Sequence, residues 1–164
     1  MALTPARSPG FLLWHATLRW QRAIAGALAP LGLTHVQFVL LASAWWLNRE
    51  GHTPTQVALA AFAGTDVKMT SQVLRSLQAK QLLARHVDPA DTRARRVTVT
   101  AAGEALAPRA IAAVEAVDEA FFAGLPRERV LELMTRLVGP GAGDQAPAPG
   151  GSTVRRSREG RSAS

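Results

Sequence analysis

The sequence contains no cysteine. This absence excludes disulfide bonds, zinc sites built from thiolates, and the sensing of oxidants through a thiol. No apolar run in the sequence approaches the roughly 18 residues that a membrane-spanning helix needs. The N-terminus also lacks a positive region followed by a continuous hydrophobic stretch and a cleavage site. We therefore expect a protein that stays in the cytoplasm and has no membrane partner.

Residues suited to catalysis are also scarce. The four histidines are scattered along the chain, and no two carboxylates pair in an apolar setting, so no nucleophile, general base or metal cluster can be recognised. Glycines gather in residues 139–151, but that segment contains prolines and follows no strand, unlike a phosphate-binding loop. The sequence thus predicts no enzymatic activity, no cofactor and no metal.

A basic segment, residues 88–100, is the most informative part of the chain. Valine and threonine alternate over residues 97–100, which is typical of a half-buried strand, and residues 82–87 form the matching strand. Pro89 and Asp91 suit the turn between them. The hairpin carries three arginines, Arg93, Arg95 and Arg96. A basic turn alone is often only solvated surface, but a projecting one also suits a phosphate backbone or a minor groove.

The residues before the hairpin favour the second interpretation. Thr53 as the N-cap, Pro54 at the first position and Gln56 at N3 predict a helix that ends near Phe62. Gly64 then permits a left-handed turn into a second helix. Two helices joined by a tight turn form a helix-turn-helix, and the hairpin behind them makes it a winged helix-turn-helix.

The second helix is capped by Thr65 or Asp66 and is expected to reach about Lys80. Its inward face consists of Val73, Leu74 and Leu77. The residues that lie early in the helix or opposite that face are expected to contact DNA: Lys68, Thr70, Ser71, Gln72 and Arg75. Gln72 can read adenine, and Arg75 can serve phosphate or guanine; ordinary solvated surface is the alternative interpretation.

Residues 31–139 resemble the multiple antibiotic resistance regulator (MarR) family of bacterial transcription factors. The residues in register with the family's wing pattern are Asp88, Pro89, Asp91, Arg93, Val97, Thr100 and Gly103. The resemblance implies that Arg93 enters the minor groove and that Asp91 helps to hold it. The chain departs from the family at Ser76, where arginine is common, and at Gln81, where glycine usually ends the helix.

The flanking segments read as helical scaffold. Apolar residues recur at helical spacing from Phe11 to the breaker Pro30, and Thr34 opens a second helix that runs to about Asn48. Thr100 can cap a long helix, and Pro126 starts a last one. These helices have more apolar surface than one small lobe would bury, which indicates a partner chain. The family likewise dimerises through its terminal helices.

The predicted fold is mainly α with a small β-hairpin wing, a winged helix-turn-helix lobe plus a helical dimerisation region. The expected division is a flexible N-terminal arm at 1–9, dimerisation helices at 10–33 and 100–139, the winged helix-turn-helix at 34–99 with its wing at 82–100, and a disordered basic tail at 140–164. The tail is either merely solvated or adds nonspecific phosphate contacts.

Charge supports a DNA-binding lobe. Residues 66–96 contain seven basic and three acidic residues, whereas residues 97–139 contain four basic and six acidic ones. Positive potential therefore concentrates on the proposed DNA-reading lobe. We expect a homodimeric repressor that binds double-stranded DNA at a pseudo-palindromic operator. The alternative is a DNA-architectural or protein-interaction winged helix without a regulatory ligand.

An effector site is less clearly encoded. All four tryptophans fall within the first two helices, where the family often holds a small effector near the DNA-binding lobe. The candidate pocket residues are Trp14, His15, His35, Trp45 and Trp46. Such a pocket would suit a small organic, for example aromatic, ligand. Aromatic residues at helical spacing are also common in a core or a dimer interface, and the histidines lack the spacing of metal ligands.

Overall fold

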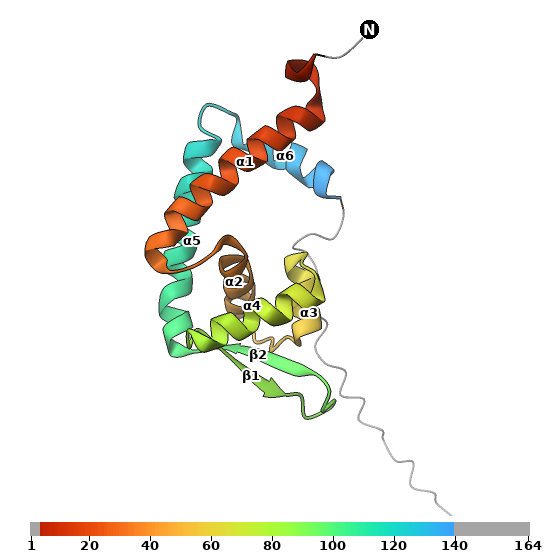
Figure 1. Cartoon of the computed structure of the whole chain (residues 1–164), viewed down its shortest axis with the longest axis vertical. Helices are drawn as coiled ribbons and strands as arrows, with labels where there is room; N and C mark the ends of the chain where they lie inside the picture. The colour runs from red at the N-terminus through yellow and green to blue at the C-terminus, as the bar shows by residue number, and fades with distance from the viewer. Residues whose placement is uncertain (1–3, 140–164) are drawn as a thin grey trace, which may run out of the picture.

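The computed structural model describes residues 4–139. Its elements in chain order are η1 (Pro5–Arg7), α1 (Pro9–Leu28), η2 (Ala29–Leu31), α2 (His35–Arg49), α3 (Gln56–Ala63), α4 (Val67–Ala79), β1 (Leu83–Val87), β2 (Arg95–Val99), α5 (Ala101–Phe121) and α6 (Arg127–Val138). Figure 1 shows α1 and α6 at one end, the hairpin at the other, and α5 joining the two. The architecture is the predicted one, helical with a single small hairpin. The expected arm includes the helical turn η1, and the expected tail lies outside the described residues.

Most helix ends are set by the residues that the sequence indicates. Thr34 and Gln37 form a reciprocal capping box at the start of α2. Gly64 ends α3 in the left-handed region at φ 66°, and the Asp66 carboxylate caps α4 by accepting from the Met69 amide at 2.9 Å. Thr100 caps α5. These local predictions are confirmed, since each depends either on a side chain that caps an amide three residues ahead or on the backbone freedom of one glycine.

The predicted start of α3 at Thr53 is wrong. The N-cap is Thr55, whose hydroxyl accepts from the Ala58 amide. Pro54 lies before the helix, where its carbonyl accepts from the Val97 amide of β2 at 2.9 Å. Thr55 also forms an isolated antiparallel bridge with Arg96. The segment therefore stays extended because the hairpin uses its backbone, a contact that no local pattern reveals.

One core joins the lobe to the long helices. Its fully buried large side chains come from α1, α2, α3, α4, β1 and β2, and they are Ile24, Leu28, Leu40, Leu41, Leu47, Leu59, Leu74, Leu77, Leu83 and Val97. Ala110 and Val114 of α5 complete it. Helix α2 lies at the centre and contacts α3, α4, α5 and β2. Because α5 packs on both α1 and α2, movement at the helical end can reach the winged lobe.

Among residues 4–139, no single helix has both the length and the apolar character needed to cross a membrane. Within the described residues, only the pair Pro9–Leu31 and His35–Arg49 reaches that length and apolar character together, and the two are bent by 72° at their junction. Much of the apolar character of α2 belongs to the core, since Leu40, Leu41 and Leu47 are fully buried.

The hairpin register assigns its arginines to different faces. Arg85 pairs with Val97, and Val87 pairs with Arg95. Directly paired residues share a face, and residues two apart along a strand do so too, so Arg85 and Arg95 lie on the same face as the buried Val97. Arg96 pairs with His86 and therefore lies on the opposite face. The alternation separates Arg95 from its neighbour Arg96.

Gln81, which follows α4, is the one non-glycine residue in the described range with a positive φ, at 59°. A Cβ in this left-handed conformation costs on the order of 1 kcal/mol. We expect Gln81→Gly to raise the free energy of unfolding by about 0.5–1 kcal/mol, measured by urea denaturation. Ala79→Gly, at the last residue of α4 two positions earlier, is the matched control and should lower the free energy of unfolding. A Gln81→Gly variant no more stable than the parent would contradict the strain argument.

Candidate nucleic-acid interface

The exposed face of α4 carries side chains suited to DNA. Lys68, Gln72 and Arg75 are exposed and lie four and three residues apart, so they share one side of the helix. Leu74 and Leu77 anchor the opposite side in the core. Ser71 is half-buried beside this face, and its hydroxyl accepts from Arg75 Nη2 at 3.4 Å. This face offers one amide and two cations, a combination that can read base edges and phosphates.

Thr70, which we expected to contact DNA, is fully buried. Its hydroxyl shares a 2.8 Å hydrogen bond with the Thr65 hydroxyl, which also donates to the Ala60 carbonyl. Thr70 therefore holds the turn between α3 and α4 and cannot reach a duplex. The sequence alone does not show this burial, because threonine occurs both on protein surfaces and in small buried polar contacts.

The tip of the hairpin presents Arg93. The Arg93 backbone amide donates to Asp91 Oδ1 at 3.0 Å, and Arg93 is exposed. Among residues 4–139 the Arg93 side chain has no hydrogen bond or ion pair within the protein. Asp91 thus holds the backbone of the turn rather than the guanidinium, which leaves the guanidinium available to a ligand.

Arg96 holds the hairpin instead of facing DNA, which corrects our expectation. Its Nε lies 2.9 Å from Asp88 Oδ2, and its Nη1 donates to the Thr53 carbonyl at 2.9 Å. Asp88 Oδ1 accepts from the Ala90 amide. The hydrogen bond from the Ala90 amide is the main reason that the pKa of Asp88 lies below its ordinary value. The hydrogen bond and the charge of Arg96 lower this pKa further, although burial opposes the shift. The contribution of Asp88 to stability is therefore complete at neutral pH and is lost as the pH falls through that lowered pKa.

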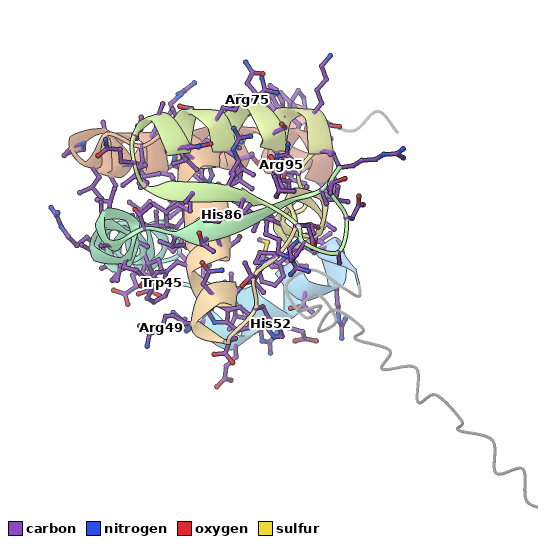
Figure 2. All side chains as sticks on the ribbon, turned by 90° about the horizontal axis from the view of Figure 1, so that it is seen from below. Trp45, Arg49, His52, Arg75, His86 and Arg95 are labelled. Atoms are coloured by element: carbon purple, nitrogen blue, oxygen red, sulfur yellow. The ribbon has the colours of Figure 1, made fainter. Side chains whose placement is uncertain are left out.

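Arg85 is a candidate that our sequence analysis missed. It lies on β1, and its Nε donates to Gln78 Oε1 of α4 at 2.6 Å. Burial lowers the pKa of Arg85, and the nearby charges of Arg75 and Arg95 lower it further. Figure 2 shows Arg75 and Arg95 at the side of the hairpin occupied by α4. The strand alternation in residues 83–87 was the available signal, but only the register shows which neighbours Arg85 meets.

The five predicted effector residues do not come together. Trp45 Nε1 donates to Glu104 of α5 at 2.8 Å, with Arg49 over its ring. Trp46 stacks on Phe62 of α3, with ring centroids 5.9 Å apart.

Two other residues predicted for the effector site, Trp14 and His15, lie on α1. Trp14 is 61% exposed, and His15 packs against the Phe11 ring. Successive helical residues point in different directions, so proximity in sequence brought neither pair of candidates to one cavity.

His35 alone borders a groove, of about 720 Å³, that the structure forms beside the helix-turn-helix. The lining residues are Gln21, Thr34, His35, Val36, Val39, Ala63, Gly64 and Thr65. They come from α1, from the start of α2 and from the turn between α3 and α4. Burial lowers the pKa of His35, while Asp118 acts in the opposite direction. The neutral form of the His35 imidazole is therefore favoured.

A hydrogen-bond network links the start of α2 to the end of α4. Gln37 Nε2 donates to Ser76 Oγ at 2.8 Å. Lys80 Nζ donates to Gln37 Oε1 at 2.8 Å and to the Gly32 carbonyl at 2.6 Å. Ser76, which stands where the family commonly has arginine, thus serves an internal contact. The groove adjoins this network at Thr34, whose amide donates to the same Gln37 oxygen.

Known proteins are similar to this chain in both sequence and architecture. The chain is 42% identical over 135 residues to the HTH-type transcriptional regulator YdcH of Bacillus subtilis, a match that covers 82% of this chain and 92% of YdcH. A MarR-family transcriptional regulator from Rhodococcus sp. RHA1 superposes with a TM-score of 0.72 at 26% identity, over 83% of this chain and 94% of that one. The chain belongs to the MarR family of transcriptional regulators. No family model matches it.

Further similar proteins extend the comparison. The HTH-type transcriptional repressor Rv2887 of Mycobacterium tuberculosis is 31% identical over 85% of this chain and 99% of its own length. BpsR of Bordetella bronchiseptica, whose DNA binding is regulated by 6-hydroxynicotinic acid, has a TM-score of 0.76 at 26% identity, covering 86% of this chain and all of BpsR. A mutant MarR of E. coli in complex with operator DNA has a TM-score of 0.69 at 25% identity, covering 80% of this chain and 93% of that one.

Proposed function

We propose that this MarR-family regulator acts in the cytoplasm as a homodimeric repressor. In this proposal α4 lies in the major groove, with Lys68, Gln72 and Arg75 toward the duplex, while Arg93 enters the adjacent minor groove. The observation that carries it is the exposed polar face of α4 beside a cationic hairpin whose carboxylates are already engaged within the turn. Repression is suggested by the repressor of M. tuberculosis, and operator binding by the E. coli complex. The proposed activity is binding rather than catalysis.

Dimerisation through the helical end is part of the proposal. Helix α6 has no buried residue within the protomer. Its apolar side chains Leu131, Leu133 and Leu137 are each more than half exposed, as are Leu12 and Leu13 near the start of α1. Apolar surface of this extent favours burial against a second copy of the chain. A twofold dimer would place two α4 helices about 34 Å apart and select a pseudo-palindromic operator.

Sequence-selective binding distinguishes this proposal from an architectural role. We expect the protein to bind a duplex that it selects from a random pool at least about a thousandfold more tightly than random DNA at one salt concentration. Gln72→Ala should reduce that ratio by relaxing the preference for one base pair in each half-site, while random-duplex affinity is retained. Equal affinities of the parent protein for selected and random DNA would favour the architectural alternative.

The groove that includes His35 is the proposed site of a small organic effector. Of the five residues predicted for this site, only His35 lines it, so the proposal moves to the set formed by α1, α2 and the α3–α4 turn. A ligand there would contact Thr65, which bonds to Thr70 of α4, and would press on Thr34 beside the Gln37 network. Both contacts connect through hydrogen bonds to α4, the proposed recognition helix, so ligand binding can change the orientation of α4.

Titration with aromatic acids tests the effector site. Trp20 packs edge-on against His35, with ring centroids 5.1 Å apart, and provides a fluorescence reporter. We expect a bound ligand to quench tryptophan emission and to release the operator over the same concentration range. His35→Ala should weaken both effects without weakening DNA binding in the absence of ligand. Release that is insensitive to His35→Ala would place the effector elsewhere.

A further inference from the structure

Three arginines from three separate elements, Arg75, Arg85 and Arg95, lie near one another where α4 meets the hairpin. Arg85 and Arg95 are diagonal neighbours across the two strands, an arrangement in which Cβ atoms lie within about 8 Å. Arg85 reaches Gln78 of α4, and Arg75 lies one helical turn before Gln78. The two hairpin arginines therefore face the same end of the recognition helix as Arg75.

No carboxylate neutralises this arginine cluster within the described residues. The two ion pairs found there are Arg96 with Asp88 and Arg136 with Glu132. The other nearby carboxylates are engaged in local structure: Asp91 accepts from the Arg93 amide, and Asp66 caps α4. Like charges brought together without a counter-ion repel each other, so the arrangement favours an anion among them.

The guanidinium groups of Arg85 and Arg95 are oriented before any ligand arrives. Gln78 occupies Arg85 Nε, which leaves both of its Nη groups free to donate as a fork. Arg95 Nη1 donates to the carbonyls of Thr92 and Ala94 in the turn, and this fixes the direction of its side chain. Fixing these long side chains in advance lowers the entropic cost of binding a ligand.

We propose that Arg75, Arg85 and Arg95 form a single phosphate-binding site for the DNA backbone strand that separates the major groove under α4 from the minor groove at Arg93. This inference rests on the proposed DNA binding and adds β1 to the contact surface. Arg85 and Arg95 set the docking distance between the recognition helix and the wing, and they act equally on every base sequence.

The salt dependence of binding tests the site. We expect Arg85→Gln to weaken binding to selected and to random duplexes by the same factor, on the order of tenfold. The slope of log affinity against log salt should become shallower, but by less than about 0.9 for each protomer, because Arg75 and Arg95 still hold the phosphate. The double variant Arg85→Gln/Arg95→Gln should lose more slope than the single one, but no more than about 0.9 for each protomer in total, because both arginines hold the same phosphate. Arg109→Gln, an exposed site on α5, is the control for charge and should match the parent.

Neutral backbone linkages locate the phosphate. A methylphosphonate placed at successive positions of the selected duplex should weaken parent binding at one linkage in each half-site, and Arg85→Gln should be less sensitive at that linkage than the parent. Parent-like affinity and slope in Arg85→Gln, or unchanged sensitivity at every linkage, would overturn the site. If Arg85→Gln melts at a lower temperature, Arg95→Gln at the start of β2 carries the same test. A parent protein that binds neither duplex would instead refute the proposed DNA binding.

Discussion

Arg93→Ala should weaken binding to any duplex on the order of tenfold per protomer, measured by titration at a fixed salt concentration. The Arg93 guanidinium has no partner among residues 4–139, whereas its backbone amide is fixed by Asp91. The substitution therefore removes the proposed groove contact and leaves the turn intact. Preference for a narrow, A·T-rich minor groove beside each half-site should fall as well, because such grooves attract arginine.

Two controls make the Arg93 result specific. Arg109→Ala removes the same charge from the exposed side of α5, and it should leave duplex affinity unchanged. The free energy of unfolding of Arg93→Ala should stay within about 0.5 kcal/mol of the parent, as for other surface substitutions. Operator affinity equal to that of the parent would refute the assignment of residues 88–100 as a DNA-contacting wing.

Gly103→Ala should lower the free energy of unfolding by about 3 kcal/mol or more. Gly103 lies in the first turn of α5, against the hairpin. A Cβ at this position would lie 2.1 Å from the Leu82 carbonyl oxygen and 2.6 Å from Val99 Cγ1. The Leu82 carbonyl accepts from the Thr100 amide at 3.1 Å, so it cannot retreat without opening the junction between the wing and α5.

Gly26→Ala is the matched control for Gly103→Ala. Gly26 also lies inside a helix, α1, and a Cβ there would meet no atom within 4 Å. Its replacement should stabilise the protomer by about 0.5–1 kcal/mol through helix propensity alone. Urea denaturation of both variants separates the steric effect from the propensity effect. Equal stabilities for the two variants would show that the α5–hairpin contact relaxes far more easily than its geometry implies.

The caps and turns could be predicted because their causes are local. Thr34, Asp66 and Thr100 each satisfy an amide three residues ahead, and Gly64 supplies a positive φ that a side chain would hinder. The alternation in residues 97–100 likewise predicts a strand wherever it packs. Local chemistry was enough to predict a winged helix-turn-helix, whereas the resemblance to the MarR family singled out Arg93 among the arginines of the hairpin.

The start of α3 and the burial of Thr70 could not be predicted in this way. Thr53 and Pro54 form an acceptable helix start, but Pro54 is used by β2, 43 residues away. Thr70 lies close to the exposed positions of α4, yet the turn before the helix supplies a partner that holds it inside. In both cases the local pattern favoured one structure, and a contact with a residue outside that pattern decided for another: Val97 for Pro54, and Thr65 for Thr70.

The amino-acid sequence by itself determined the elements of this MarR-family regulator, most of their caps and the concentration of charge in one lobe. Only the tertiary structure decided what each arginine of the hairpin does. Strand alternation separates Arg95 from Arg96, but it cannot say which face meets α4. That choice depends on Gln78, Thr53 and Asp88, which bind arginines of both strands through side-chain and backbone oxygens. Contacts of that kind form only after distant segments have packed on the shared core.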